Sequence, residues 1–172
     1  VESESPAGMR SLGPQRVAAF IAEPIGGATT GAAVPTDDYW PAVTEVCRRH
    51  GVLLIADEVM TGFGRTGAWF AMDHWGVAPD IMVAAKGASS GYWPLGLCVA
   101  SGEVHETVLA GGGFVHGLTF SHHPVGAAGG RAVLRRSDSP TPSPLSATAT
   151  ISASRDRSSG FSTASAASRR AS

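Results

Sequence analysis

Two charged side chains follow two short apolar runs, and their chemistry is complementary. Lys86 is the only lysine in a chain with twelve arginines, and it comes directly after the apolar residues 81–85. The apolar residues 52–56 are followed by the acidic pair Asp57 and Glu58. A neutral lysine amine can attack a carbonyl carbon, and a carboxylate can hold a positive charge nearby. The pair indicates a site in which an amine and an acid act on one bound molecule.

An aldehyde cofactor held as a Schiff base is the natural partner of such a lysine in a largely dry pocket. Pyridoxal phosphate also needs an anion at its ring nitrogen, so that the ring absorbs electrons from a substrate carbanion. Asp57 can supply that anion, and Lys86 can supply the amine and later the base that moves a proton. Two plainer explanations stand beside this one. A GC-rich gene prefers arginine codons, and Asp57 can instead cap a helix or form an ion pair.

The elements that must place these residues alternate between strand and helix. Residues 17–23, 52–56, 81–85 and 95–100 have the continuous apolar character of buried strands. Helices are expected from a cap at Thr36 to Gly51, over 103–109 and over 124–134. Trp40, Val43 and Cys47 share one face of the first helix. This order predicts an α/β fold with a parallel sheet covered on both faces, where ligands bind beyond the carboxyl ends of the strands.

Composition divides the chain into three segments. Residues 1–16 are polar and form a surface lead-in, and residues 17–134 carry the patterned sequence of one domain. From residue 135 the chain becomes a Ser/Ala/Arg-rich tail, and 12 of the 36 residues from 137 to 172 are serine. Such a segment cannot bury enough apolar surface to offset its ordering entropy, so we expect residues 135–172 to be disordered or read out of frame.

Charge and cysteine content exclude several classes of protein. The net charge of −1 gives no footprint for nucleic acid or for an anionic membrane. No secretory signal and no apolar stretch of membrane-spanning length occurs in the sequence. Cys47 and Cys98 form no zinc or disulfide pattern, and we expect buried free thiols and a cytoplasmic location. His116, His122 and His123 lack the spacing of metal ligands, so no metal site is expected.

Five blocks of sequence together resemble the class III pyridoxal-phosphate aminotransferases, the omega-aminotransferase group. The most specific is residues 57–67, DEVMTGFGRTG. The others are AEPI at 22–25, DHWGVAPDI at 73–81, Lys86-Gly87 with GYWPLG at 91–96, and HGLTFS at 116–121 with Pro124. They occur in family order across residues 17–134. The resemblance implies part of the large domain of a fold type I transferase, a mainly parallel sheet flanked by helices.

The resemblance also implies a role for individual residues. Lys86 would form the Schiff base with pyridoxal phosphate, and Asp57 would pair with its ring nitrogen. Val59 would pack under the ring, and Thr119 would bind the phosphate in the neighbouring subunit of a homodimer. Glu23 would lie near the substrate or support the site. Thr119 can instead satisfy only backbone groups, and Arg65 is expected to anchor its own loop rather than bind a substrate carboxylate.

The implied reaction moves an amino group from an amine or omega-amino acid to a keto acid. A related aminomutase or decarboxylase, and a non-catalytic fragment, remain alternatives. Where many members have a glutamine, this chain has Met60, which cannot donate a hydrogen bond to the cofactor. The family's earlier glycine-rich turn and stacking aromatic residue are not recognisable in residues 1–16, and its small C-terminal domain has no counterpart. We therefore expect a truncated chain that is frameshifted after about residue 134.

Overall fold

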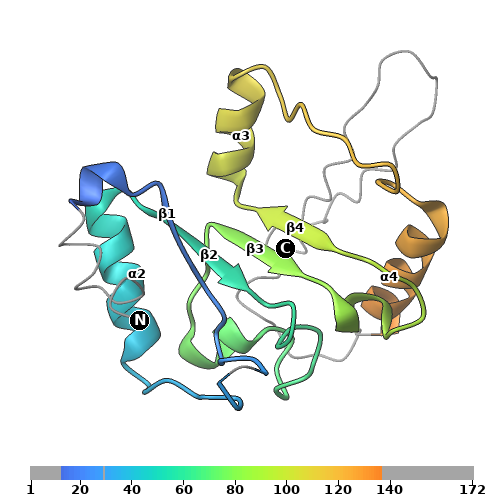
Figure 1. Ribbon diagram of the computed structural model, residues 1–172, viewed down its shortest axis with the longest axis horizontal. Coiled ribbons are helices and arrows are strands. Elements are labelled where there is room, and N and C mark those ends of the chain that lie inside the picture. The colour runs from blue at the N-terminus through green and yellow to red at the C-terminus, as the bar shows by residue number, and fades with distance from the viewer. Residues whose placement is uncertain (1–12, 29, 137–172) are drawn as a thin grey trace, which may run out of the picture.

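The computed structural model describes residues 13–28 and 30–136. Figure 1 shows a sheet that crosses the centre of this part, with α2 at the left of the view and α4 at the right. The predictions for residues 1–12 of the lead-in and for residues 137–172 of the tail lie outside the described residues. They stay predictions.

The sheet has four strands in the order β1-β2-β3-β4. Their bounds are β1 Ala19–Ala22, β2 Leu53–Asp57, β3 Ile81–Ala84 and β4 Leu97–Ala100. The first three are parallel, as predicted, whereas β4 runs antiparallel to β3. The strand expected over 95–100 therefore exists but returns in the opposite direction. The connection between β3 and β4 contains the short helix η4 (Lys86–Ser89), and it is not the long helical crossover that a parallel return requires.

Helix α2 (Tyr39–His50) forms the main core with one face of the sheet. Its buried positions include Trp40, Val43 and Cys47, the face that the helical spacing predicts. These side chains pack in one cluster with Phe20, Leu54 and other buried residues of the sheet. The indole Nε1 of Trp40 also donates a hydrogen bond of 3.0 Å to the carbonyl of Pro24, which fastens the helix to the end of β1.

The ends of α2 agree with the sequence prediction at one end only. Gly51 takes the left-handed conformation, with φ 65°, and ends the helix as expected. The predicted cap at Thr36 is wrong, because Asp38 occupies the N-cap position and the helix begins at Tyr39. Thr36 instead accepts a hydrogen bond from the Tyr39 amide through its backbone carbonyl, so it belongs to the turn before the helix.

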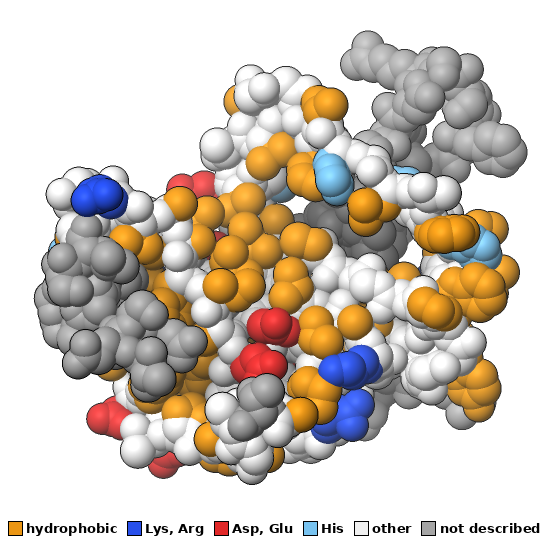
Figure 2. Space-filling model, viewed as in Figure 1, with side chains coloured by type: hydrophobic (Ala, Val, Ile, Leu, Met, Phe, Trp, Pro, Cys, Tyr) orange, Lys and Arg blue, Asp and Glu red, His pale blue; other side chains and the backbone are white. Residues whose placement is uncertain are grey.

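The second face of the sheet differs from the prediction of a sheet covered on both sides. Paired positions on this face, Ile21, Ile55 and Ile81, are exposed or half-buried, whereas their chain neighbours Phe20 and Leu54 are buried. Figure 2 shows hydrophobic side chains gathered over the strands in this view, with acidic and then basic side chains beside them. In the described part of the chain, this apolar surface is open.

The remaining elements follow the sheet along the chain. They are η2 (Pro14–Arg16) before β1, η3 (Ala71–Trp75) between β2 and β3, and then α3 (Gly102–Ala110) and α4 (Pro124–Arg136). Cys98 lies on the edge strand β4 and is exposed, so the prediction of two buried thiols holds for Cys47 alone. No helix in the described ranges is long and apolar enough to cross a bilayer.

Candidate active site

Asp57 and Lys86 come from the carboxyl ends of two neighbouring parallel strands. Asp57 is the last residue of β2, and its partner in the register is Val83 of β3. The next amide, that of Glu58, donates a hydrogen bond of 2.8 Å to the Val83 carbonyl. Strand β3 ends at Ala84, and η4 begins with Lys86. The two residues therefore leave the sheet at the same edge, which is the arrangement that the sequence predicts.

Lys86 is held in an unusual backbone conformation at the start of η4. Its φ of 43° lies in the left-handed region, which residues other than glycine adopt at a cost in free energy. Its Nζ donates a hydrogen bond to the sulfur of Met60. Among the described residues, the only ion pair joins Arg49 and Glu45, so the Lys86 amine has no carboxylate partner there.

Lys86 does not lie in the largely dry pocket that we expected. Lys86 is exposed. The close neighbour beneath it is the segment that follows β2. A Cβ atom at Gly87 would lie 2.9 Å from the Cβ of Phe63 and 3.2 Å from the carbonyl oxygen of Gly62. Only glycine allows the turn of Lys86 to approach that segment so closely.

Asp57 is half-buried and has one carboxylate oxygen free. Its Oδ1 accepts a hydrogen bond of 3.0 Å from the amide of Val59. Its Oδ2 accepts none from the described residues. The Asp57 side chain projects from the open face of the sheet, the face that also carries Ile55. A carboxylate held by a backbone amide and open on its other oxygen can bind a cationic N–H group.

Glu58 has a different environment from the acid beside it. Its side chain is 0% exposed, and both of its oxygens accept hydrogen bonds. The Thr61 hydroxyl and the Ala71 amide (3.1 Å) donate to Oε2, and the Met72 amide (2.9 Å) donates to Oε1. The sequence places Glu58 beside Asp57 but does not reveal these partners, because two of them lie 13 and 14 residues further along the chain.

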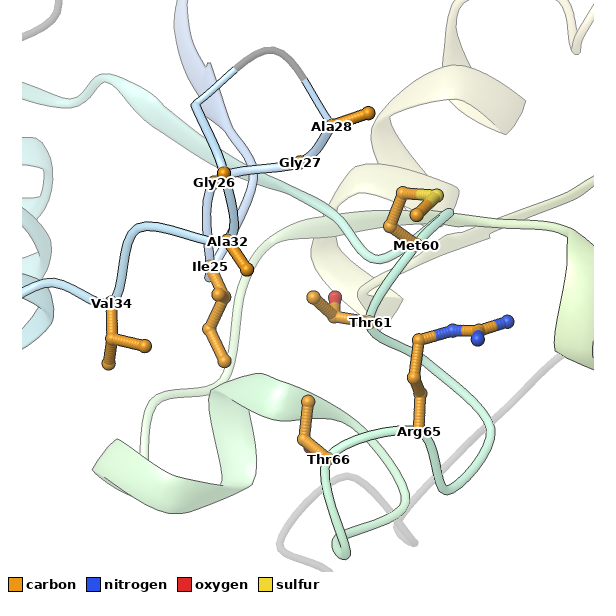
Figure 3. Close-up of a pocket in the computed structure, with 11 residues that line it drawn as sticks. Ile25, Gly26, Gly27, Ala28, Ala32, Val34, Met60, Thr61, Arg65 and Thr66 are labelled. Atoms are coloured by element: carbon orange, nitrogen blue, oxygen red, sulfur yellow. The ribbon is translucent and has the colours of Figure 1, made fainter.

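A pocket of about 640 Å³ lies beside this site (Figure 3). One wall is the loop after β1, with Ile25, Ala32 and Val34, and the other includes Met60 and Arg65. Met60 therefore lines the pocket and also contacts Lys86. The expectation that Arg65 anchors its loop is wrong for the described residues. The Arg65 side chain is exposed and makes no hydrogen bond or ion pair with any of them.

Glu23 lies at the same edge of the sheet as Asp57. It follows β1 directly, and Ala22 at the end of β1 pairs with Ala56 of β2. The Glu23 carboxylate packs against the pocket loop, since a Cβ atom at Gly27 would lie 2.6 Å from its Oε2. The structure thus brings Glu23 to the pocket wall.

Thr119 stands apart from these residues. It is exposed in the connection between α3 and α4 and makes no hydrogen bond to any described residue. Its neighbours Leu118 and Phe120 are also exposed, so this connection presents an apolar surface together with the hydroxyl. Over the described ranges, no three His, Cys, Asp or Glu side chains come together as a metal site.

The sequence of this chain is similar to a known protein family and to several of its members. Residues 3–141 match the family model of class-III aminotransferases. The chain is 53% identical over 117 residues to a putrescine–pyruvate aminotransferase from Pseudomonas aeruginosa, which covers 68% of this chain and 25% of that protein. It is 42% identical over 124 residues to an omega-amino acid–pyruvate aminotransferase from Pseudomonas putida, covering 69% of this chain and 27% of that protein.

A solved structure supports the same relationship. An amine transaminase from an uncultivated Pseudomonas species, in a PLP-bound form, matches with a TM-score of 0.70 and 49% identity, over 74% of this chain and 30% of the other. The chain thus spans between a quarter and a third of the length of these relatives. The family match covers most of the sequence, and the chain belongs to the class-III aminotransferase family.

Proposed function

We propose that this chain supplies the cofactor-binding part of a pyridoxal-phosphate-dependent transaminase. The enzyme would move an amino group from an amine or omega-amino acid to a keto acid. The observation that carries the proposal is the placement of Asp57 and Lys86 at the ends of neighbouring parallel strands, with Asp57 opposite Val83. The names of the relatives, which include amine and omega-amino acid aminotransferases, support the substrate class.

The residues present fit pyridoxal phosphate by their chemistry. Lys86 is a primary amine without an acidic partner among the described residues, which leaves it available for covalent attachment of an aldehyde. Asp57 keeps Oδ2 open for a protonated ring nitrogen. Val59 lies two residues after Asp57, is half-buried and offers an apolar surface for the ring. When bound, the cofactor supplies an electrophilic carbon and a ring that takes up electrons.

The roles of the protein groups follow from these positions. Asp57 holds positive charge through Oδ2 while Val59 keeps the carboxylate oriented through its amide. Lys86, once its amine is free and neutral, accepts a proton at Nζ and returns it to a neighbouring atom. Met60 contacts that amine with a sulfur, which cannot donate a hydrogen bond. The polar contacts of the site therefore come mainly from the lysine and the aspartate.

We assign the substrate to the pocket beside Met60. Its lining is mostly apolar, which suits the carbon chain of an amine, and Arg65 is the charged residue in its wall. Glu23 packs against Gly27 of the same wall and would lie near the substrate. Thr119 would bind the cofactor phosphate of a neighbouring subunit, so the active enzyme would be a homodimer. The active enzyme would also bring further protein over this site, because Lys86 and Thr119 are both exposed.

The single lysine makes the proposal directly testable. The purified chain is incubated with pyridoxal phosphate, reduced with borohydride, digested and mapped by mass spectrometry. We expect the reduced cofactor on the peptide that contains Lys86 and a visible absorbance before reduction. In Lys86→Arg, which keeps the charge but cannot form the bond, both signals are lost. Labelling confined to the α-amino group of the wild-type chain would contradict the proposal.

A further inference from the structure

We infer that Glu58 is a positioning residue for the proposed site: its buried carboxylate fixes the segment on which Asp57 and Lys86 both depend. This inference rests on the proposed function. Glu58 does not face the pocket or the cofactor residues, and we assign it no contact with substrate. Its effect is exerted through residues 58–63, which connect the end of β2 to the turn beneath Lys86.

The Glu58 carboxylate ties this segment to the start of η3. It is 0% exposed, and it accepts hydrogen bonds from one hydroxyl, that of Thr61, and from two amides at the start of η3, those of Ala71 and Met72. A buried carboxylate is costly unless its oxygens are satisfied, and here both are. Two points 14 residues apart along the chain, Glu58 and Met72, are thereby joined at one side chain.

The backbone of Glu58 is held by β3 on one side and by its own turn on the other. Its amide donates to Val83 of β3, and its carbonyl accepts a hydrogen bond of 2.9 Å from the Gly62 amide. A Cβ atom at Gly62 would lie 2.9 Å from that carbonyl oxygen, so the turn is as tight as a glycine permits. Within this turn, the Val59 amide holds Oδ1 of Asp57. The orientation of Asp57 therefore depends on the turn that Glu58 secures.

Lys86 rests on the other side of the same segment. Its Nζ contacts the Met60 sulfur, and Gly87 fits against Phe63 and the Gly62 carbonyl. A shift of the segment would change the position of the amine and of the acid together. Misplacement of about 1 Å at a reacting group is enough to lower a rate by about 100-fold. This geometry makes Glu58 a determinant of the site although it touches neither cofactor nor substrate.

The test compares Glu58→Gln with Val43→Ala. Glutamine has nearly the same shape, but its amide presents N–H groups where three donors already point inward. Val43 is fully buried on α2 and makes no hydrogen bond to Glu58, so its truncation lowers stability without removing a partner of the Glu58 carboxylate. The first measurement is amide hydrogen exchange without cofactor. The second is the yield of borohydride-trapped pyridoxal phosphate on Lys86, with the visible absorption maximum before reduction.

In Glu58→Gln we expect amide exchange at Val59, Gly62, Ala71 and Met72 to be faster than in wild type. This increase should exceed the increase at β1 by at least about tenfold. The trapping yield falls by a similar factor, and the absorption maximum shifts because Asp57 is no longer held. Val43→Ala speeds exchange across the sheet without singling out residues 58–63, and it keeps the absorption maximum. If Glu58→Gln does not fold, Thr61→Val, which removes one donor, replaces it and is compared with Thr61→Ser.

The outcomes separate the two proposals. A wild-type chain that traps no cofactor on Lys86 overturns the proposed function, and the exchange measurement still decides whether Glu58 fixes the segment. A wild-type chain that traps cofactor, together with a Glu58→Gln or Thr61→Val chain of unchanged exchange, yield and absorption, overturns the positioning role. Selective loss of protection with a shifted absorption maximum supports it.

Discussion

Asp57 on β2 lies opposite Val83 on β3, and Lys86 follows Val83 by three residues. Because these two strands are parallel, their carboxyl ends lie at the same edge of the sheet, where both side chains can reach one bound molecule. Residues 58–80 supply the length of chain that a parallel return needs. The same residues carry Val59, Met60 and Glu58, so the crossover itself contributes to the site.

The charge of Asp57 can be removed without removing its hydrogen bond to Val59. In Asp57→Asn the side-chain oxygen still accepts from the Val59 amide, and the fold should be kept. We expect the affinity for pyridoxal phosphate to fall by about 10- to 100-fold, since a hydrogen bond to a charged group contributes about 1.5–3 kcal/mol. The measurement is a titration of the visible absorbance with cofactor.

Asp37→Asn is the matched control for this prediction. It removes an acid that is exposed and lies in the turn before α2. Cofactor affinity should be unchanged in this variant. Equal affinity in Asp57→Asn and wild type would mean that Asp57 does not pair with the ring nitrogen.

The left-handed conformation of Lys86 predicts a conflict between stability and function. With φ at 43°, a residue with a Cβ atom is strained, and glycine is not. Both Lys86→Gly and Lys86→Ala lose the amine, but we expect the glycine variant to be more stable than the alanine variant by about 1 kcal/mol. Denaturant unfolding of the two variants measures the difference. A more stable alanine variant would show that the strain is not present in solution.

The sequence predicts elements best where one local signal decides them. The spacing of Trp40, Val43 and Cys47 gives the buried face of α2, and Gly51 gives its end because only glycine takes the left-handed conformation readily. Thr36 was a poor guide because two aspartates follow it, and any of the three side chains can cap a helix. The direction of β4 could not be predicted from its own residues, which are apolar in either direction. It depends on the connection that contains η4.

The site was predictable to the extent that strand ends carry it. Asp57 and Lys86 each follow an apolar run, and that pattern is visible in the sequence. The partners of Glu58 were not predictable, because Ala71 and Met72 bind through backbone amides that leave no mark on residue type. The exposure of Lys86 could not be predicted, because burial depends on packing between segments and the residues around a lysine do not determine that packing.

The two cysteines should react at very different rates with a thiol reagent. Cys98 is exposed on β4, whereas Cys47 is buried on α2. We expect one thiol to be modified rapidly in the native chain and the second only after unfolding. Mass mapping with Cys98→Ser and Cys47→Ser identifies each. Rapid modification of Cys47 in the native chain would indicate that α2 detaches from the sheet.

The buried thiol of Cys47 should make the stability of the fold depend on pH. Burial, and to a smaller extent the negative charge of Asp80, raise the pKa of Cys47 in the folded chain. The unfolded thiol therefore ionises at lower pH than the folded one. Stability from this group is complete below the ordinary thiol pKa and is lost as pH rises from there toward the folded value. Denaturant unfolding at rising pH should show this slope in wild type and not in Cys47→Ala.

The open face of the sheet predicts poor solubility of the chain as it stands. Ile21 lies on the edge strand β1 and is 56% exposed, and an apolar edge strand invites pairing with other chains. We expect Ile21→Lys to raise the soluble fraction without loss of the fold, because a charge on an edge strand opposes that pairing.

Phe20→Lys is the matched control, since Phe20 is the adjacent residue and is buried in the core. It should unfold the chain and lower the soluble fraction. Sedimentation after expression and circular dichroism of the soluble material measure both effects, and equal behaviour of the two variants would mean that β1 does not present these opposite faces.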